Sequence, residues 1–126
     1  MAELILEPYA VNQRWRLIGN TATWENLISQ FMEMLACRCH ETGRAIIGHI
    51  KALALFPDGG YLRVSAVSPT LPAGVEGSVP TGCTELVLTL NVIVYGLERH
   101  ALERLTRETA DDLTKKWKGG VNIEAL

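Results

Sequence analysis

The chain has 126 residues, of which 48% are hydrophobic, and a formal net charge of −2. A chain of this length is one domain, residues 1–126, and it can fold around a core without disulfides or a structural metal. The balanced charge argues against broad electrostatic binding to nucleic acid or anionic lipid, and the sequence lacks an apolar run long enough to span a membrane.

The cysteine content and the start of the chain bear on the cellular compartment. There are three cysteines, an odd number, and the first residues lack the basic and apolar regions of a secretory signal. No disulfide framework is indicated, so we expect a cytoplasmic protein with reduced thiols.

Residues 3–18 predict the first strand. Apolar and polar residues alternate from Tyr9 to Leu17, and the alternation is broken only at Gln13. Pro8 cannot donate to a strand ladder, so we expect a kink or an edge position there.

A helix is predicted to follow, ending near Gly43. Thr21 or Thr23 can cap its first turn, and Gly43 suits a left-handed C-cap. The apolar residues that recur at helical spacing are Trp24, Leu27, Ile28, Phe31, Leu35 and Cys39.

Two strands, residues 46–56 and 61–67, are predicted to form a hairpin. The sequence between them, Pro57-Asp58-Gly59-Gly60, is typical of a tight turn. Alternation in the first strand divides its residues into two faces. One face holds Ile46, Gly48, Ile50, Ala52, Ala54 and Phe56, and the other holds Ile47, His49, Lys51, Leu53 and Leu55.

Residues 68–83 predict a long irregular connection. The segment contains Pro69, Pro72, Pro80, Gly74, Gly77 and Gly82, which disfavour a regular element through most of it. Connections of this length in a compact domain are usually functional or disordered.

The last part of the chain predicts a long strand and a second helix. Residues 84–95 alternate, with Leu86, Leu88, Leu90, Val92 and Val94 on one face. The helix that follows repeats apolar or small residues every four positions, at Ala101, Leu105, Thr109, Leu113 and Trp117. Gly119 and Gly120 end this helix, and residues 121–126 are expected to be a short tail, frayed or docked on a neighbour.

The predicted order is strand, helix, strand, strand, strand, helix. This order favours an α+β two-layer sandwich, in which a mostly antiparallel sheet of about four strands carries both helices on one face. The other face would present Val87, Ile93 and Tyr95 of the long strand, with Thr89 and Asn91 as the polar breaks between them. Such a face is too apolar for water, so we expect either a loop or a second copy of the chain to cover it.

The sequence contains no catalytic or nucleotide-binding signature. The first hypothesis is therefore a non-catalytic assembly or binding module that forms a homo-oligomer, most simply a dimer. The alternative is a small enzyme or small-ligand binder whose site lies under residues 68–83. For that site the candidate residues are His49 and Lys51, two apart on one strand, and Cys83 at the end of the connection.

Two further interpretations are weaker. Cys37, Cys39 and His40 lack the paired spacing of zinc ligands, and Cys39 continues an apolar stripe, so we expect buried thiols and neither a metal nor a cofactor. Nucleic-acid binding would use Arg14, Arg16 and residues 115–118, but aromatic and basic residues are not interleaved on any one strand.

Overall fold

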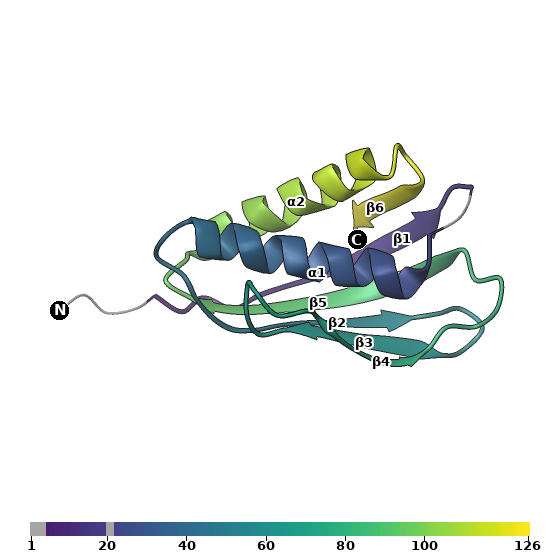
Figure 1. Cartoon of the computed structure of the whole chain (residues 1–126), viewed down its shortest axis with the longest axis horizontal. Coiled ribbons are helices and arrows are strands. Elements are labelled where there is room, and N and C mark those ends of the chain that lie inside the picture. The colour runs from purple at the N-terminus through teal and green to yellow at the C-terminus, as the bar shows by residue number, and fades with distance from the viewer. Residues whose placement is uncertain (1–4, 20–21) are drawn as a thin grey trace.

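The computed structural model describes residues 5–19 and 22–126. Within them, a six-stranded antiparallel sheet carries two helices on one face (Figure 1). The elements are β1 (Tyr9–Leu17), α1 (Trp24–Glu41), β2 (Ile46–Leu55), β3 (Tyr61–Ala66), β4 (Gly74–Ser78), β5 (Glu85–Tyr95), α2 (Arg99–Lys116) and β6 (Val121–Ala125). The strands lie in the order β4-β3-β2-β5-β1-β6, which confirms the predicted α+β class and antiparallel sheet.

The prediction of four strands is wrong, because β4 lies in the segment that was expected to be irregular. β4 pairs with β3, and Gly77 within it has a φ of +115°. A Cβ at Gly77 would collide with the carbonyl oxygen of Tyr61 on β3. This glycine is therefore required by the close approach of two paired strands, whereas the sequence suggests a break.

β6 is the second strand that was not predicted. The chain reverses at Gly119, which has a φ of +79°, and returns along β1 so that Val121 pairs with Leu17. Val121 is buried in the core. The expected tail thus covers what would otherwise be the exposed edge of β1.

β2 carries a β-bulge that changes which face its first residues occupy. Its pairing with β5 shifts between Ile47 and His49. Because of this shift, Ile46 lies opposite Tyr95 on the face away from the helices and is 57% exposed, whereas Ile47 packs against the core. The faces predicted for Ile46 and Ile47 are therefore wrong, and those of His49 and the residues after it are correct.

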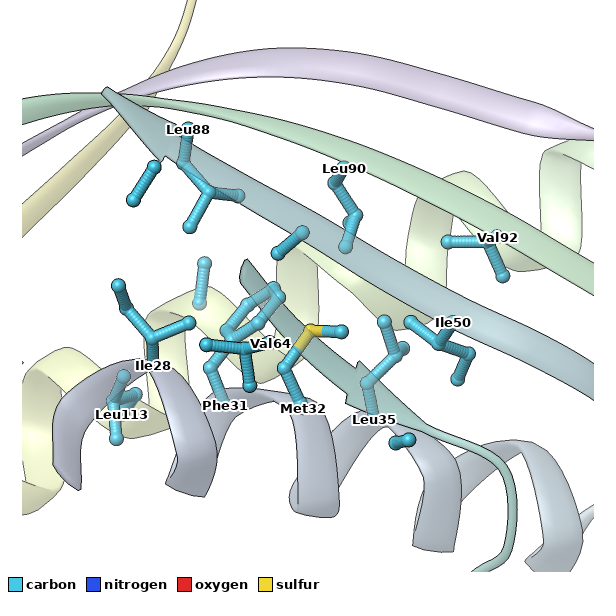
Figure 2. Close-up of a cluster of buried hydrophobic side chains, with 14 of the residues drawn as sticks. Ile28, Phe31, Met32, Leu35, Ile50, Val64, Leu88, Leu90, Val92 and Leu113 are labelled. Atoms are coloured by element: carbon cyan, nitrogen blue, oxygen red, sulfur yellow. The ribbon is translucent and has the colours of Figure 1, made fainter. Parts of the chain in front are cut away.

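The core lies between the sheet and the two helices, as Figure 2 shows for its central part. The residues that were predicted to meet there are all buried: Trp24, Phe31 and Leu35 of α1, Leu105 and Leu113 of α2, and Leu86, Leu88, Leu90 and Val92 of β5. The ring of Phe31 packs edge-on against Trp15 of β1, with 5.3 Å between the centroids.

Helix α1 begins and ends as predicted. The Oγ1 of Thr23 accepts a hydrogen bond of 3.3 Å from the backbone N–H of Asn26. Gly43 follows the last turn with a φ of +77°. The alternative cap, Thr21, and the first two residues of the strand predicted over 3–18 lie outside the described residues. Residues 5–8 are described but precede β1, which runs from Tyr9 to Leu17, so the predicted strand begins too early.

Candidate functional site

The open face of the sheet, which we define as the face away from the helices, carries five of the six predicted site residues. His49 and Lys51 come from β2, and Val87, Ile93 and Tyr95 come from β5. These two strands pair in the middle of the sheet, so the five residues lie on neighbouring strands. Figure 1 shows both helices on the other side of the sheet.

A hollow of about 680 Å³ crosses the middle of this face, and we call it the open-face hollow. The open-face side chains that line it come from four adjacent strands: Lys51, Leu53, Arg63, Ser65, Gly74, Glu76, Thr89 and Asn91. They form two cross-strand rows, one through Lys51 and the other through Leu53. Gly74, Ser65 and Thr89 in these rows have small side chains or none, so the surface is lower here than at the rows on either side.

Apolar side chains stand on both sides of this hollow. One flanking row contains Tyr61, Leu55 and Val87, and the other contains His49 and Ile93. The apolar residues of the open face therefore form two groups with a polar region between them. They do not form the single continuous patch that alternation along one strand suggests.

The charged groups in the open-face hollow are two cations and one carboxylate. Lys51, Arg63 and Glu76 are all exposed. Within the part of the chain that the structure describes, no carboxylate oxygen lies within 4.0 Å of the Lys51 or Arg63 nitrogen atoms. The guanidinium of Arg63 instead lies over the ring of Tyr61, with its central carbon 5.4 Å from the ring centroid. This cation–π contact orients Arg63 without neutralising its charge.

A hydrogen bond to the neighbouring strand β1 engages Thr89, one of the residues that line the hollow. Thr89 Oγ1 on β5 donates to Asn12 Oδ1 on β1 at 2.8 Å. This bond occupies the Thr89 hydroxyl proton. The donors that line the hollow are Lys51, Arg63 and the amide of Asn91, and its one carboxylate is that of Glu76. Such a set suits a ligand rich in acceptor oxygens, such as a carboxylate or a phosphate.

Cys83 lies away from this hollow, near the start of β5. The eight residue steps from Glu85 to Ile93, the partner of His49, span about 27 Å along a strand. The thiol of Cys83 contacts the carbonyl oxygen of Glu85, at 3.9 Å. The structure therefore does not bring Cys83 and His49 together as a nucleophile and its base.

The cysteines of α1 also diverge. Cys39 is buried in the core, and this burial raises the pKa of its thiol to about 11. Cys37 donates from its Sγ to the carbonyl oxygen of Pro69, at 3.3 Å. In residues 5–19 and 22–126, no group of three or more histidine, cysteine or acidic side chains lies close enough together to hold a metal ion. Cys37, Cys39 and His40 therefore belong to no such group.

Of residues 68–83, only residues 74–76 line the open-face hollow. Near the start of the segment, Pro69 contacts Cys37, and the backbone N–H of Ala73 donates to Glu33 Oε2 of α1 at 2.9 Å. This part of the segment therefore lies on the helix side of the sheet. β4 then extends the sheet, and Gly74 and Glu76 line the hollow at its edge. The expected cover over the open face is not formed by these residues.

Arg63, Ser65 and Glu76 are site residues that the sequence did not indicate. Arg63 is visible only as an outward residue of the predicted hairpin, and its position beside Lys51 follows from the hairpin register. Glu76 joins them because it pairs with Arg63 from a strand that was not predicted. Thr89 and Asn91 did give a signal, since they interrupt an apolar strand.

No family model matches the chain, and comparisons with curated proteins and with solved structures find no significant match. Among the described residues, neither helix has the length and apolar character needed to cross a membrane. The function must therefore be argued from the site itself.

Proposed function

We propose that the protein is a non-catalytic binding module that holds a small anionic ligand, with a carboxylate or phosphate group, in the open-face hollow. The observation that carries this proposal is the pair of cations, Lys51 and Arg63, which lack a carboxylate partner among the described residues. Two cations against the single carboxylate of Glu76 leave the hollow with an excess of positive charge, which attracts an anion.

The relative placement of the two cations supports a single anionic group between them. Lys51 pairs directly with Ser65, so Arg63 is its diagonal neighbour across β2 and β3. Diagonal neighbours in antiparallel strands lie about 7–8 Å apart, so both side chains can reach one group once the Arg63 guanidinium swings from the Tyr61 ring toward Lys51. Arg63 can hold it with two N–H donors, and Lys51 adds a point charge.

The shape of the hollow fits a small molecule better than a macromolecule. A volume of about 680 Å³ falls within the range of roughly 300–1,000 Å³ that is usual for ligand pockets. Leu53 provides an apolar surface for the uncharged part of the ligand. The lining holds one carboxylate, Glu76, and no histidine, so it lacks the paired acid and base of a hydrolytic site.

Titration of the isotope-labelled protein with inorganic phosphate and with citrate tests this proposal. We expect saturable shifts of the backbone amides of β2 and β3. Lys51→Gln and Arg63→Gln should each weaken the affinity by about tenfold or more, because each removes a charge-assisted hydrogen bond. Lys115→Gln, which removes one positive charge from the exposed side of α2, is the matched control and should bind like the wild type. Equal weakening in all three variants would show nonspecific charge attraction and contradict the proposal.

The second candidate function is homo-oligomerisation through the same open face. It is favoured by the apolar groups that flank the hollow, which include Val87, Ile93 and Tyr95, together with Leu55, whose exposure is 50%. The six strands lie about 4.8 Å apart, and the central strand β5 is about 34 Å long, so the open face has an area of roughly 800 Å². Each partner in a standard protein interface buries about that area.

Light scattering separates the two candidates. If the open face forms the interface, Ile93→Lys should dissociate the oligomer while both helices remain folded. The matched control is Leu71→Lys, because Leu71 is 57% exposed and lies in the segment that contacts α1. A wild-type protein that stays monomeric at high micromolar concentration would rule out the oligomer and leave the ligand proposal unaffected.

A further inference from the structure

A second hollow, of about 210 Å³, lies on the other side of the sheet, between α2 and the strands β1 and β6. We call it the helix-side hollow. It shares no lining residue with the open-face hollow. The helix and the sheet meet here through short side chains, namely those of Val11, Ala110 and Ala125, which leave the gap unfilled.

Its inner wall contains an amide whose donors have no partner. Gln13 is 4% exposed, and its Oε1 accepts a hydrogen bond of 3.0 Å from the indole Nε1 of Trp15. Because an indole N–H only donates, this bond fixes the amide oxygen toward Trp15. Among the described residues nothing accepts a hydrogen bond from the amide nitrogen, so its two N–H donors are left for a molecule in the hollow, which Gln13 lines.

The wall that α2 provides also contains an unsatisfied polar group. Thr106 is 2% exposed, and its buried Oγ1 makes no hydrogen bond. Thr109 on the same helix shows the usual arrangement, in which Oγ1 donates to the carbonyl oxygen of Leu105 at 2.6 Å. Unpaired buried groups are rare in proteins. Thr106 Oγ1 is such a group, and the Gln13 amide nitrogen, for which the described residues provide no acceptor, lies on the opposite wall of the same hollow.

The mouth of the hollow is acidic. Nη1 of Arg107 lies 3.9 Å from Oε1 of Glu103, whereas Asp111 forms no ion pair within the described residues. Two carboxylates and one guanidinium leave one net negative charge at the mouth. Burial and the neighbouring Glu103 carboxylate raise the pKa of Tyr9, which also lines the hollow.

We propose that the helix-side hollow binds a small organic amine that also carries a carbonyl or hydroxyl oxygen. The oxygen accepts hydrogen bonds from the amide of Gln13, and the ammonium group lies beside Asp111 at the mouth. A volume of 210 Å³ corresponds to about seven water molecules at ~30 Å³ each, which limits the ligand to the size of a small amino-acid derivative. This site is independent of the anionic ligand proposed for the open face.

The proposal is tested with three probes by following the side-chain amide of Gln13 and the backbone amide of Thr106 in NMR spectra. L-Serinamide carries both an amine and a carbonyl oxygen, putrescine lacks the oxygen, and glycerol lacks the amine. We expect saturable shifts with L-serinamide at a Kd of about 1 mM, as befits so small a ligand. Putrescine and glycerol should each bind about tenfold more weakly or not at all.

A charge variant then tests the role of the mouth. Asp111→Asn should lower the affinity for L-serinamide by about tenfold, because it removes the partner of the ammonium group. Asp58→Asn, in the turn between β2 and β3, is the matched control and should leave the affinity unchanged. Absent shifts at Gln13, or equal shifts with all three probes, would overturn the proposal. Unchanged affinity in Asp111→Asn would overturn the assignment of an amine.

Discussion

Two positions on β5 provide a direct test of which face of the sheet is buried. Leu90 is fully buried between the sheet and α1, beside the side chains that Figure 2 shows, whereas Val87 lies half-buried on the open face. Leu90→Ala removes three buried carbon atoms, worth about 2.4 kcal/mol at ~0.8 kcal/mol each, and leaves a cavity that adds to this loss. We therefore expect Leu90→Ala to lower the free energy of unfolding by about 3–4 kcal/mol.

Val87→Ala should lower the free energy of unfolding by less than about 1 kcal/mol in a monomer, because the removed carbon atoms are partly in contact with water already. Urea denaturation followed by tryptophan fluorescence measures both changes, since Trp15 is buried in the same core. The titrations are carried out at low and at high protein concentration. If the open face is an oligomer interface, only the effect of Val87→Ala grows with concentration.

Equal losses in the two variants would contradict the assignment of the two faces. A loss below about 0.5 kcal/mol for Leu90→Ala would mean that β5 is displaced by one residue, because a shift of one position moves every side chain to the other face. A larger loss for Val87→Ala than for Leu90→Ala at all concentrations would place the core on the side opposite to the helices.

Three other predictions concern single residues or matched pairs of residues, and each is measured by urea or thermal denaturation. Thr106→Val should raise the free energy of unfolding by about 1 kcal/mol because it removes a buried hydroxyl that has no partner, whereas Thr109→Val should lower it by a similar amount because that hydroxyl is bonded. The pKa of Cys39 is raised from 9.0 to about 11, so its stabilising contribution is complete below pH 9 and is lost as the pH rises toward 11. Cys39→Ala should therefore flatten the pH dependence of the free energy of unfolding over that interval. Gly96→Ala should cost more than Gly43→Ala, by at least about 1 kcal/mol, because both have positive φ but only at Gly96 would a Cβ collide with a backbone carbonyl.

The elements that local periodicity specifies were predictable from the sequence. Helix α1 has an uninterrupted apolar stripe, a cap at Thr23 and a terminal glycine at Gly43, and all three lie within the helix or beside it. β5 alternates over its whole length, so its buried face could be assigned from the sequence. Such patterns need no knowledge of the neighbouring elements.

Strands at the edge of the sheet were not predictable, because little of their pattern is local. Every residue of β4 is exposed, so β4 has no apolar alternation to reveal it. Its glycines resemble a loop, although Gly77 permits close pairing with β3. β6 has only five residues and depends on β1 for its pairing. The β-bulge at Gly48 has the same origin, since it is defined only by the pairing of β2 with β5.

The candidate site was predictable only in part, because it too depends on how the strands pair. Alternation alone grouped Lys51 with His49 and Leu53 on one face of β2, and the structure shows that this face points away from the helices. Its neighbours Arg63 and Glu76 depend on the register of two hairpin-like pairings, and the second of these involves β4. Cys83 was proposed because it borders a long connection, but nearness in sequence to a connection does not fix the distance from Lys51 or His49 in space.

Polar residues that interrupt an apolar strand were the most informative signal for the two hollows. Gln13 breaks the alternation of β1 on the inward side and lines the helix-side hollow. Thr89 and Asn91 break the apolar character of β5 on the outward side and line the open-face hollow. A polar side chain placed where its neighbours are apolar lowers stability unless it finds a partner. The Thr89 hydroxyl finds a partner in Asn12, and the amide oxygen of Gln13 accepts a hydrogen bond from Trp15. The amide nitrogen has no acceptor in the described chain, so the sequence pattern and the unsatisfied donors both support the ligand proposed for the helix-side hollow.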